Sequence, residues 1–202
     1  MKSALLFLVI VTFGSQLFAE TPAQQFLAGK TKFSTAGHPK SKGISMTIEY
    51  PTTWTAKEGE RPNIVQKFTS PGGQEMVGIM TKSIPIPAGT KITEDELKEF
   101  FTPDEMKSLL PEVATFISAK PTKIEGLPAG ILEYSMRQER AGLSIDMQVV
   151  AFIFIHEATM VQVLCSVGGG SDQAASFPKR MAEFMPLFTL MANSIVLPDR
   201  WK

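Results

Sequence analysis

Apolar and polar residues alternate over several short stretches in the first half of the chain. From 44 to 50 every second residue is apolar, and the stretches 64–68 and 76–84 are also rich in apolar residues. A period of two is typical of strands with one buried face. Pro51 ends the first stretch, and the turn sequence at 70–73 separates the other two. We therefore expect three strands that form an antiparallel meander.

Four further strands are expected in the second half of the chain. Short turn sequences separate them, which favours antiparallel pairing. The seven residues Val149–Ile155 are apolar at every position, which is typical of a central strand that is covered on both faces. The four stretches are 114–124, 129–138, 144–155 and 159–167. The predicted fold is α/β (α+β), with an antiparallel sheet of six to seven strands flanked by helices on both faces.

The helices of this fold are expected near 93–110 and 174–192. Thr93 and Glu96 have the spacing of a capping box. Thr102 and Glu105 have the spacing of a second one, with Pro103 at the first helical position, which predicts two short helices or one broken helix. The second region carries one apolar stripe, formed by Met181, Phe184, Met185, Phe188 and Met191. Pro186 is expected to kink this helix, and 193–197 is expected to form a last short strand.

Residues 1–19 have the pattern of a secretory signal peptide. Lys2 is followed by an apolar run of about ten residues and by small residues up to Ala19. A bilayer-spanning helix needs about twenty apolar residues, so we expect cleavage after Ala19 and export to the periplasm or the medium. An uncleaved anchor and a buried N-terminal helix are the alternatives.

Residues 20–42 are predicted to form a basic flexible leader before a single domain at 43–202. No acidic residue occurs between Glu20 and Glu49, while several glycines and a proline discourage long regular structure. The basic side chains of this leader are Lys30, Lys32, His38, Lys40 and Lys42. Two interpretations stay open: a solvated leader with one short strand, or an arm that docks onto an acidic partner or an anionic membrane surface.

The overall charge argues against one class of partner. Loss of Lys2 with the signal peptide leaves 19 basic and 20 acidic residues, a net charge of −1. Nonspecific nucleic-acid binding needs a basic surface that releases phosphate counterions, so we expect no nucleic-acid partner. The single cysteine, Cys165, shares one face of an expected strand with Val161, Val163 and Val167, which alternate with Gln162, Leu164 and Ser166. This pattern predicts a buried and unreactive thiol.

The motifs that could carry chemistry are incomplete. Ser176 and Lys179 match a Ser-x-x-Lys pair, but the partner motifs of acyl enzymes are missing. Gly168–Gly170 lacks the lysine of a nucleotide-binding loop, and the two histidines lie far apart in the sequence. The methionines fit core positions better than a copper(I) site. We therefore expect no catalytic residue, no metal site and no cofactor.

Several short sequence motifs resemble those of a known family. Tyr50–Trp54 resembles its "YP-x-x-W" opening, Gly126–Ala129 its "G-x-P-A" turn, and Asn193–Ile195 its ending. Over about 43–198 the chain is similar to the PsbP-like and DcrB-like α/β/α sandwich proteins. The resemblance implies a non-catalytic accessory protein that assists a protein complex. It also implies a docking role for a basic N-terminal segment, to which 30–42 is the nearest equivalent.

The chain departs from this family in two respects. It has no recognisable thylakoid transit region and no cysteine for a lipid anchor. The expected function is an exported, soluble, non-catalytic binding protein whose partner is an unidentified protein complex or envelope component, without a stable membrane anchor. A carrier of a small apolar ligand and a hydrolase with dispersed catalytic residues are the alternatives. A filled core supports the first function, a wide apolar cavity the second, and a deep pocket with converging polar groups the third.

Overall fold

The computed structural model describes residues 20–86, 92–140 and 142–201. The predicted signal peptide at 1–19 lies outside these ranges. Seven strands form one antiparallel sheet in the order β3-β4-β5-β9-β8-β7-β6. Their bounds are β3 Thr55–Glu58, β4 Ile64–Thr69, β5 Glu75–Ser83, β6 Ala114–Ile124, β7 Leu127–Arg140, β8 Leu143–His156 and β9 Thr159–Gly169. The predicted antiparallel sheet is confirmed.

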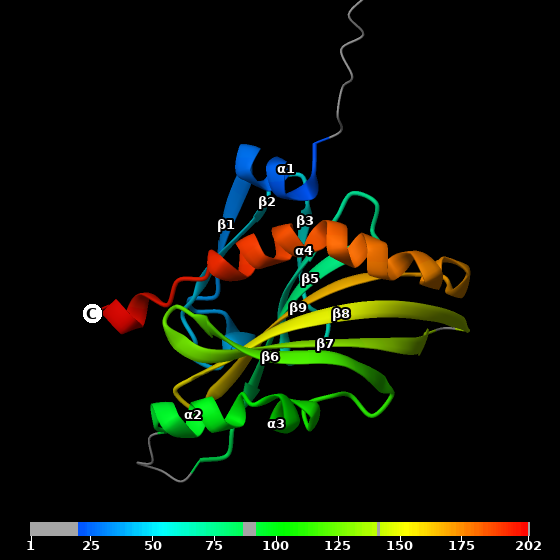
Figure 1. Ribbon diagram of the computed structural model, residues 1–202. Coiled ribbons are helices and arrows are strands. Elements are labelled where there is room, and N and C mark those ends of the chain that lie inside the picture. The colour runs from blue at the N-terminus through cyan, green and yellow to red at the C-terminus, as the bar shows by residue number, and fades with distance from the viewer. Residues whose placement is uncertain (1–19, 87–91, 141, 202) are drawn as a thin grey trace, which may run out of the picture.

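Helices lie on both faces of this sheet, as Figure 1 shows. α2 (Glu94–Phe100) and α3 (Pro103–Lys107) cover one face, and α4 (Phe177–Asn193) lies along the other, with α1 (Pro22–Ala28) packed against it. A separate cluster of buried apolar side chains fills the space beneath each helical layer. The expected three-layer arrangement is therefore confirmed.

β8 owes its position inside the sheet to its sequence. Because successive side chains of a strand point to opposite faces, Phe152 and Phe154 enter the cluster under α4, while Ala151 and Ile153 enter the cluster under α2 and α3. All four side chains are at most 3% exposed. The run that is apolar at every position predicted this two-sided burial.

The two short helices start where the sequence predicts. The hydroxyl of Thr93 accepts from the backbone N–H of Glu96, whose carboxylate accepts in return from the backbone N–H of Thr93. This confirms the first capping box. The second one is wrong, because Thr102 precedes α3 without a side-chain cap bond. Pro103 at the first helical position still starts the helix, since its fixed φ suits that place.

α4 runs continuously through Pro186 and ends later than expected. Its last turn includes Asn193, and the following chain forms one isolated bridge in which Val196 and Thr47 exchange both backbone hydrogen bonds at 2.9 and 3.0 Å. The predicted strand at 193–197 is therefore reduced to this bridge. It joins the end of α4 to β2 (Thr47–Pro51).

A buried ion pair fixes the other end of α4 to the sheet. The guanidinium of Arg180, in the first turns of α4, contacts the carboxylate of Glu75 at the start of β5. The hydroxyl of Ser70 donates a second hydrogen bond of 2.6 Å to the same carboxylate. Glu75 is 6% exposed, so these donors offset the cost of burying its charge.

Residues 20–42 differ from the flexible leader that the sequence suggested. They form α1, β1 (Lys30–Ser34) and η1 (Pro39–Ser41), and β1 pairs antiparallel with β2. Phe26 is 2% exposed within the cluster under α4, and Phe33 packs edge-on against Phe68 of β4. The apolar side chains of this segment therefore attach it to the domain, whose core includes residues before 43.

The seven-stranded sheet differs from the predicted one in one member. The expected strand at 44–50 forms β2 at 47–51 instead, in the separate two-stranded sheet with β1. Its place in the count is taken by β3, which was not predicted because all four of its residues are exposed and show no alternation. The alternation predicted a strand correctly, but pairing partners are set by tertiary contacts.

Candidate functional site

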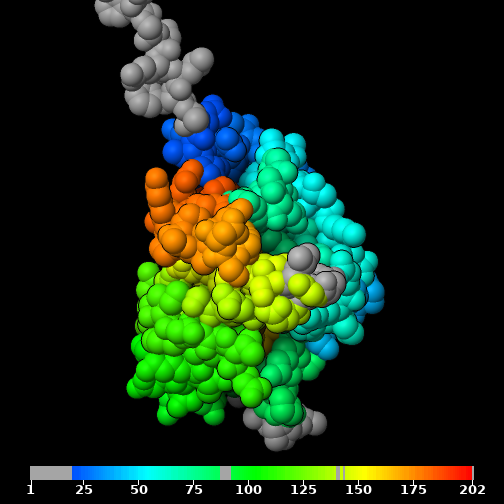
Figure 2. All heavy atoms as spheres, turned by 90° about the vertical axis from the view of Figure 1, so that its right-hand side faces the viewer, coloured from blue at the N-terminus to red at the C-terminus, as the bar shows by residue number. Residues whose placement is uncertain are grey.

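An open hollow of about 540 Å³ lies between the sheet and the start of α4. Strands β6, β7 and β8 form its floor, and Phe177 and Pro178 at the first turn of α4 form one wall. Figure 2 shows this end of the molecule, with the start of α4 in orange above the yellow-green end of β7 and β8. The lining residues are Val113, Thr115, Ile117, Ser135, Met136, Arg137, Asp146, Met147, Gln148, Ala174, Phe177 and Pro178.

The hollow lies where the apolar face of β8 gives way to polar residues. On the face that α4 covers, Phe154, Phe152 and Val150 are buried. Continuing along the same face towards the start of β8, the alternation places Gln148 and Asp146 next. Gln148 is 8% exposed and the side chain of Asp146 is 14% exposed. Polar side chains are costly to bury without partners, and hydrogen bonds with Glu133 and Arg137 offset that cost here.

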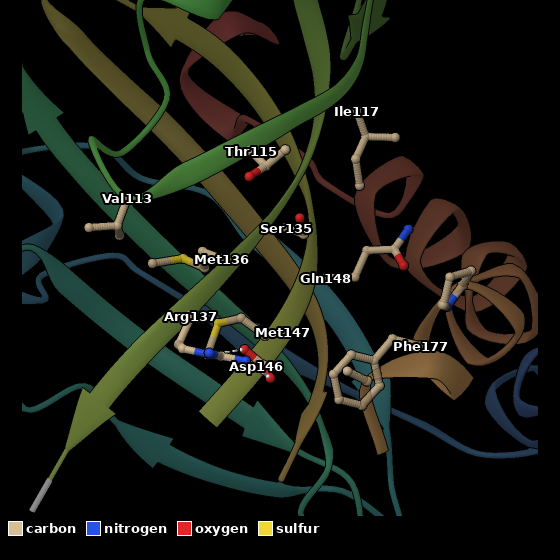
Figure 3. A pocket seen from close by; sticks show the side chains of 12 residues that line it. Val113, Thr115, Ile117, Ser135, Met136, Arg137, Asp146, Met147, Gln148 and Phe177 are labelled. Atoms are coloured by element: carbon tan, nitrogen blue, oxygen red, sulfur yellow. Dashed lines mark hydrogen bonds and ion pairs between the residues drawn. The ribbon is translucent and has the colours of Figure 1, made fainter. Parts of the chain in front are cut away.

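An ion pair crosses the floor of the hollow. Nε and Nη2 of Arg137 donate to the two carboxylate oxygens of Asp146 over 2.7 and 2.9 Å, and the two residues are cross-strand partners in β7 and β8. Figure 3 shows the pair with its dashed line. The hydrogen bond from Arg137, with a weaker contribution from Ser171, holds the pKa of the Asp146 carboxyl below its usual range. This carboxylate is therefore a poor general base at neutral pH.

A second group of hydrogen bonds lies farther along the same strands. The carboxylate of Glu133 accepts from the amide of Gln148 over 2.7 Å and from the hydroxyl of Ser118 over 3.1 Å. A hydroxyl or thiol nucleophile is commonly activated by a free base beside it. Neither histidine lines the hollow, and these two carboxylates are engaged by neighbouring side chains. The arrangement suits binding better than acid–base chemistry.

Exposed apolar side chains lie along the edge strand β6, and two of them line the hollow. Val113, Phe116 and Ile117 are 64%, 36% and 45% exposed, and Val113 and Ile117 line the hollow itself. The ammonium of Lys107 lies 5.0 Å from the centre of the Phe116 ring. In Figure 3 Val113 and Ile117 lie beside β6, while Phe177 lies on the side of α4. Apolar groups gathered beside a polar hollow are typical of binding surfaces.

A smaller hollow of about 360 Å³ opens beside the glycine-rich end of β9. Met76, Ile145 and Met147 line it together with Gly168–Gly170. Gly168 and Gly169 belong to β9, and Gly170 precedes η2 (Ser171–Ser176). Two of these glycines therefore end β9 and the third connects it to η2, and their neighbours in this hollow are mainly apolar.

Two of the predicted basic docking residues form ion pairs within the chain. Nζ of Lys30 lies 2.5 Å from the carboxylate of Glu49 in β2. Nζ of Lys40 lies 2.7 Å from the carboxylate of Glu58 in β3 and 2.5 Å from the backbone oxygen of Gly59. The pKa of Glu58 is lowered by the hydrogen bond from Lys40. Much of the positive charge expected for docking is therefore balanced inside the fold.

The other three predicted residues do not converge on one site. Nδ1 of His38 accepts from the backbone N–H of Lys40 and caps η1. Lys32 and Lys42 are exposed on β1 and after η1. None of the five lines either of the two hollows. The sequence identified the charge cluster but missed the hollow, whose polar residues are spread over three strands.

Metal-ligating side chains and the thiol of Cys165 are the other candidates for chemistry. Among the described residues, no group of three or more histidine, cysteine, aspartate or glutamate side chains is arranged to hold a metal ion. Cys165 is buried in β9, and burial raises the pKa of its thiol. The predicted buried thiol is confirmed. A thiol of this kind is a poor nucleophile, because the thiolate is the reactive form.

Comparison with known proteins gives structural likenesses only. No protein-family profile and no curated protein matches the chain. The chain is similar to LpqN, described as involved in cell envelope biogenesis of Mycobacterium tuberculosis, with a TM-score of 0.44 and 13% identity over 88% of this chain and 96% of that chain. It is also similar to the protein of unknown function PA94 from Pseudomonas aeruginosa, with a TM-score of 0.36 and 13% identity over 74% of this chain and 90% of that chain.

A third likeness is to a cyanobacterial PsbP, CyanoP, from Synechocystis sp. PCC 6803. The TM-score is 0.49 and the identity 17%, over 84% of this chain and 93% of that chain.

Proposed function

We propose that the chain is an exported, non-catalytic binding protein that docks onto a protein complex or another component of the cell envelope. The observation that carries this proposal is the pair of exposed apolar side chains, Val113 and Ile117, that line the open hollow, with Phe116 exposed nearby on the opposite face of β6. Exposing such side chains together is unfavourable in water, and contact with a partner would remove them from it.

The alternative functions receive less support from the described residues. A carrier normally encloses most of an apolar ligand, whereas both hollows are open to solvent. A hydrolase needs an activated nucleophile, whereas Asp146 and Glu133 are held by hydrogen bonds and Cys165 is buried. The near-neutral charge of the chain also gives no support for a nucleic-acid partner.

Export rests on the sequence of residues 1–19. Within the described residues, no helix is long and apolar enough to cross a membrane. Expression of the full chain in its own cell, followed by mass spectrometry of the protein, tests the proposal. Export with cleavage predicts a mature protein that begins at Glu20. A full-length protein retained with the cytosol would contradict it.

The docking proposal is tested with matched variants of the mature protein. We expect that Val113→Ser with Ile117→Ser reduces capture of the partner from solubilised envelopes, because both side chains border the hollow. Leu27→Ser is the control, since Leu27 is 64% exposed on α1, as Val113 is on the rim. Equal capture by the rim variant and the wild-type chain would refute the docking site.

A contribution from the basic segment stays a separate proposal. Lys32 and Lys42 are the members whose side chains remain exposed without an ion pair among the described residues. Changing both to glutamine should weaken envelope association only at low salt, because exposed charges are screened within about 10 Å at 0.1 M salt. Unchanged association at low ionic strength would contradict a docking role for these lysines.

A further inference from the structure

The face of the seven-stranded sheet that carries α2 and α3 is covered over only part of its width. These helices pack over β6 and β7, and Figure 1 shows them beneath these strands. Farther across the sheet, Ile64 of β4 and Met76 and Met80 of β5 are half-buried and belong to neither core cluster. Ile64 is the cross-strand partner of Met80, and Met76 shares their face because side chains alternate along a strand. Together with Leu164 of β9, these residues form what we call the open face.

Two glycines inside strands show how the covered part differs from the open face. Gly130 of β7 lies beneath the helices, where a methyl group would lie 2.1 Å from the sulfur of Met106. Gly78 of β5 lies on the same side of the sheet, because its cross-strand partner Leu164 packs against the cluster under α2 and α3. A methyl group on Gly78 would meet none of the described atoms within 4 Å. A glycine inside a strand often marks the close approach of another backbone, and at Gly78 the described part of the chain supplies none.

The centre of the open face is apolar. A sheet face that meets water normally carries polar side chains, whereas Ile64, Met76 and Met80 surround Gly78. The hollow of about 360 Å³ lies at one end of this face, where Met76 and Ser166 line it. Removing apolar surface from water is favourable. The open face therefore suits an apolar partner surface that places a side chain in the hollow.

The rim of the open face is basic. Lys67 of β4 is the cross-strand partner of Lys57 in β3 and of Gly78 in β5, and Lys82 lies four residues farther along β5 on the same side. The strands carry no acidic residue on this side of the sheet. Lys67 pairs with Glu60 of the β3–β4 turn over 3.2 Å, whereas Lys57 and Lys82 have no ion pair among the described residues. Like charges directly opposite each other on two strands are unfavourable, so acidic groups of a partner would stabilise this rim.

We propose that an amphipathic helix of a partner protein docks on the open face, with its apolar stripe over Gly78 and acidic side chains towards Lys57 and Lys82. Such a helix would continue the layer that α2 and α3 begin. Helices of this kind bind through apolar residues spaced three and four apart. A second copy of the chain fits less well, because a two-fold symmetric contact brings the same patch to both sides and would set lysines against lysines.

This surface is separate from the rim of the larger hollow, on which the proposed docking function rests. The larger hollow is bounded by the start of α4 and by Val113 and Ile117, whereas the open face lies on the side of the sheet away from α4. The variant Val113→Ser with Ile117→Ser should therefore leave helix binding unchanged. Failure of either proposal does not decide the other.

The experiment uses the mature protein and a labelled synthetic amphipathic helical peptide with a leucine stripe flanked by glutamates. We expect saturable binding by fluorescence anisotropy at low salt, and no binding of the same peptide with lysines in place of the glutamates. Methionine methyl groups labelled with ¹³C locate the peptide by NMR. The resonances of Met76 and Met80 should shift, while those of Met181 and Met191, buried under α4, should stay in place.

Matched variants test the charge and the close approach. Lys57→Glu with Lys82→Glu should weaken binding of the acidic peptide by roughly tenfold at low salt. Lys120→Glu with Lys123→Glu makes the same change of charge on the opposite edge strand β6 and should leave binding unchanged. Gly78→Thr should also weaken binding without lowering the melting temperature, because the added side chain fills open space.

Three results would overturn the proposal. Unchanged resonances of Met76 and Met80, or equal weakening by the two pairs of lysine variants, would show that the peptide does not bind the open face. Shifts of these resonances with vesicles of anionic phospholipid but not with the peptide would identify a membrane surface as the occupant. A dimer in sedimentation velocity that Gly78→Thr disrupts would identify a second copy instead.

Discussion

Gly130 in β7 gives the sharpest test of how the sheet packs against α2 and α3. A methyl group at this position would lie 2.1 Å from the sulfur of Met106 and 2.9 Å from a ring carbon of Phe101. Ordinary contacts between such atoms are about 3.5–4.0 Å, so the sulfur has to retreat by roughly 1.5 Å. Both neighbours are at most 1% exposed, which leaves them little room to move.

The expected cost of Gly130→Ala follows from overpacking. Inserting a methyl group into a filled core costs about 1–3 kcal/mol. A cost of about 2 kcal/mol lowers the melting temperature by about 4–8 °C in a domain of this size. Urea unfolding of the mature protein, followed by circular dichroism and tryptophan fluorescence, measures the free energy of unfolding directly.

Gly78 in β5 provides the matched control. It lies in the same sheet, but a methyl group there would meet no atom within 4 Å. Gly78→Ala should therefore be neutral or stabilising by up to about 1 kcal/mol, because alanine restricts the unfolded chain. Equal stability of the Gly130→Ala and Gly78→Ala variants would refute the packing described here. In the Gly130→Ala variant, Met106→Ala should lower the free energy of unfolding by less than it does in the wild-type chain, because it also removes the clash between the new methyl group and the Met106 sulfur.

Three further predictions concern charge and the thiol. Arg180→Met should destabilise the protein by about 2–4 kcal/mol in urea unfolding, because it leaves Glu75 buried without its cation. Adding Glu75→Gln should restore part of this loss. No restoration would contradict a stabilising ion pair between Arg180 and Glu75. Arg137→Ala should lower the stability at pH 7, because Arg137 lowers the pKa of Asp146 and pairs with its carboxylate. The stability difference between variant and wild type should shrink as the pH falls below about 4, since protonation of Asp146 removes the charge that Arg137 stabilises. A difference in melting temperature that does not depend on pH would contradict this. Cys165 should react with Ellman's reagent only after unfolding, and rapid labelling of the native protein would show that β9 opens.

The sequence predicted the elements whose signals are local. The two-sided burial of β8 follows from the apolar run Val149–Ile155, which no half-exposed strand would carry. The start of α2 follows from Thr93 and Glu96, because the capping box needs only residues three apart. β3 could not be predicted in this way: residues 55–58 have no alternation, and only their pairing with β4 makes them a strand.

The hollow was partly predictable from the alternation of β8. On one face of this strand the residues change from Phe152 and Val150 to Gln148 and Asp146. This change marks the point at which the floor of the hollow becomes polar. The partners of these side chains could not be read from the sequence, because Arg137 meets Asp146 only once the β7–β8 register is fixed.

The basic segment shows why a charge cluster alone does not define a docking arm. The lysines between 30 and 42 suggested a solvated leader, yet Phe33 lies among them. The rings of Phe33 and Tyr50 both pack against the ring of Phe68. Because β1 alternates, its lysines lie on the outer face while Phe33 points to the core. The acids that balance the cluster, such as Glu49, come from strands outside it. Charge counted along the chain therefore overstated the charge left for a partner, because ion pairs with residues outside the segment neutralise part of it.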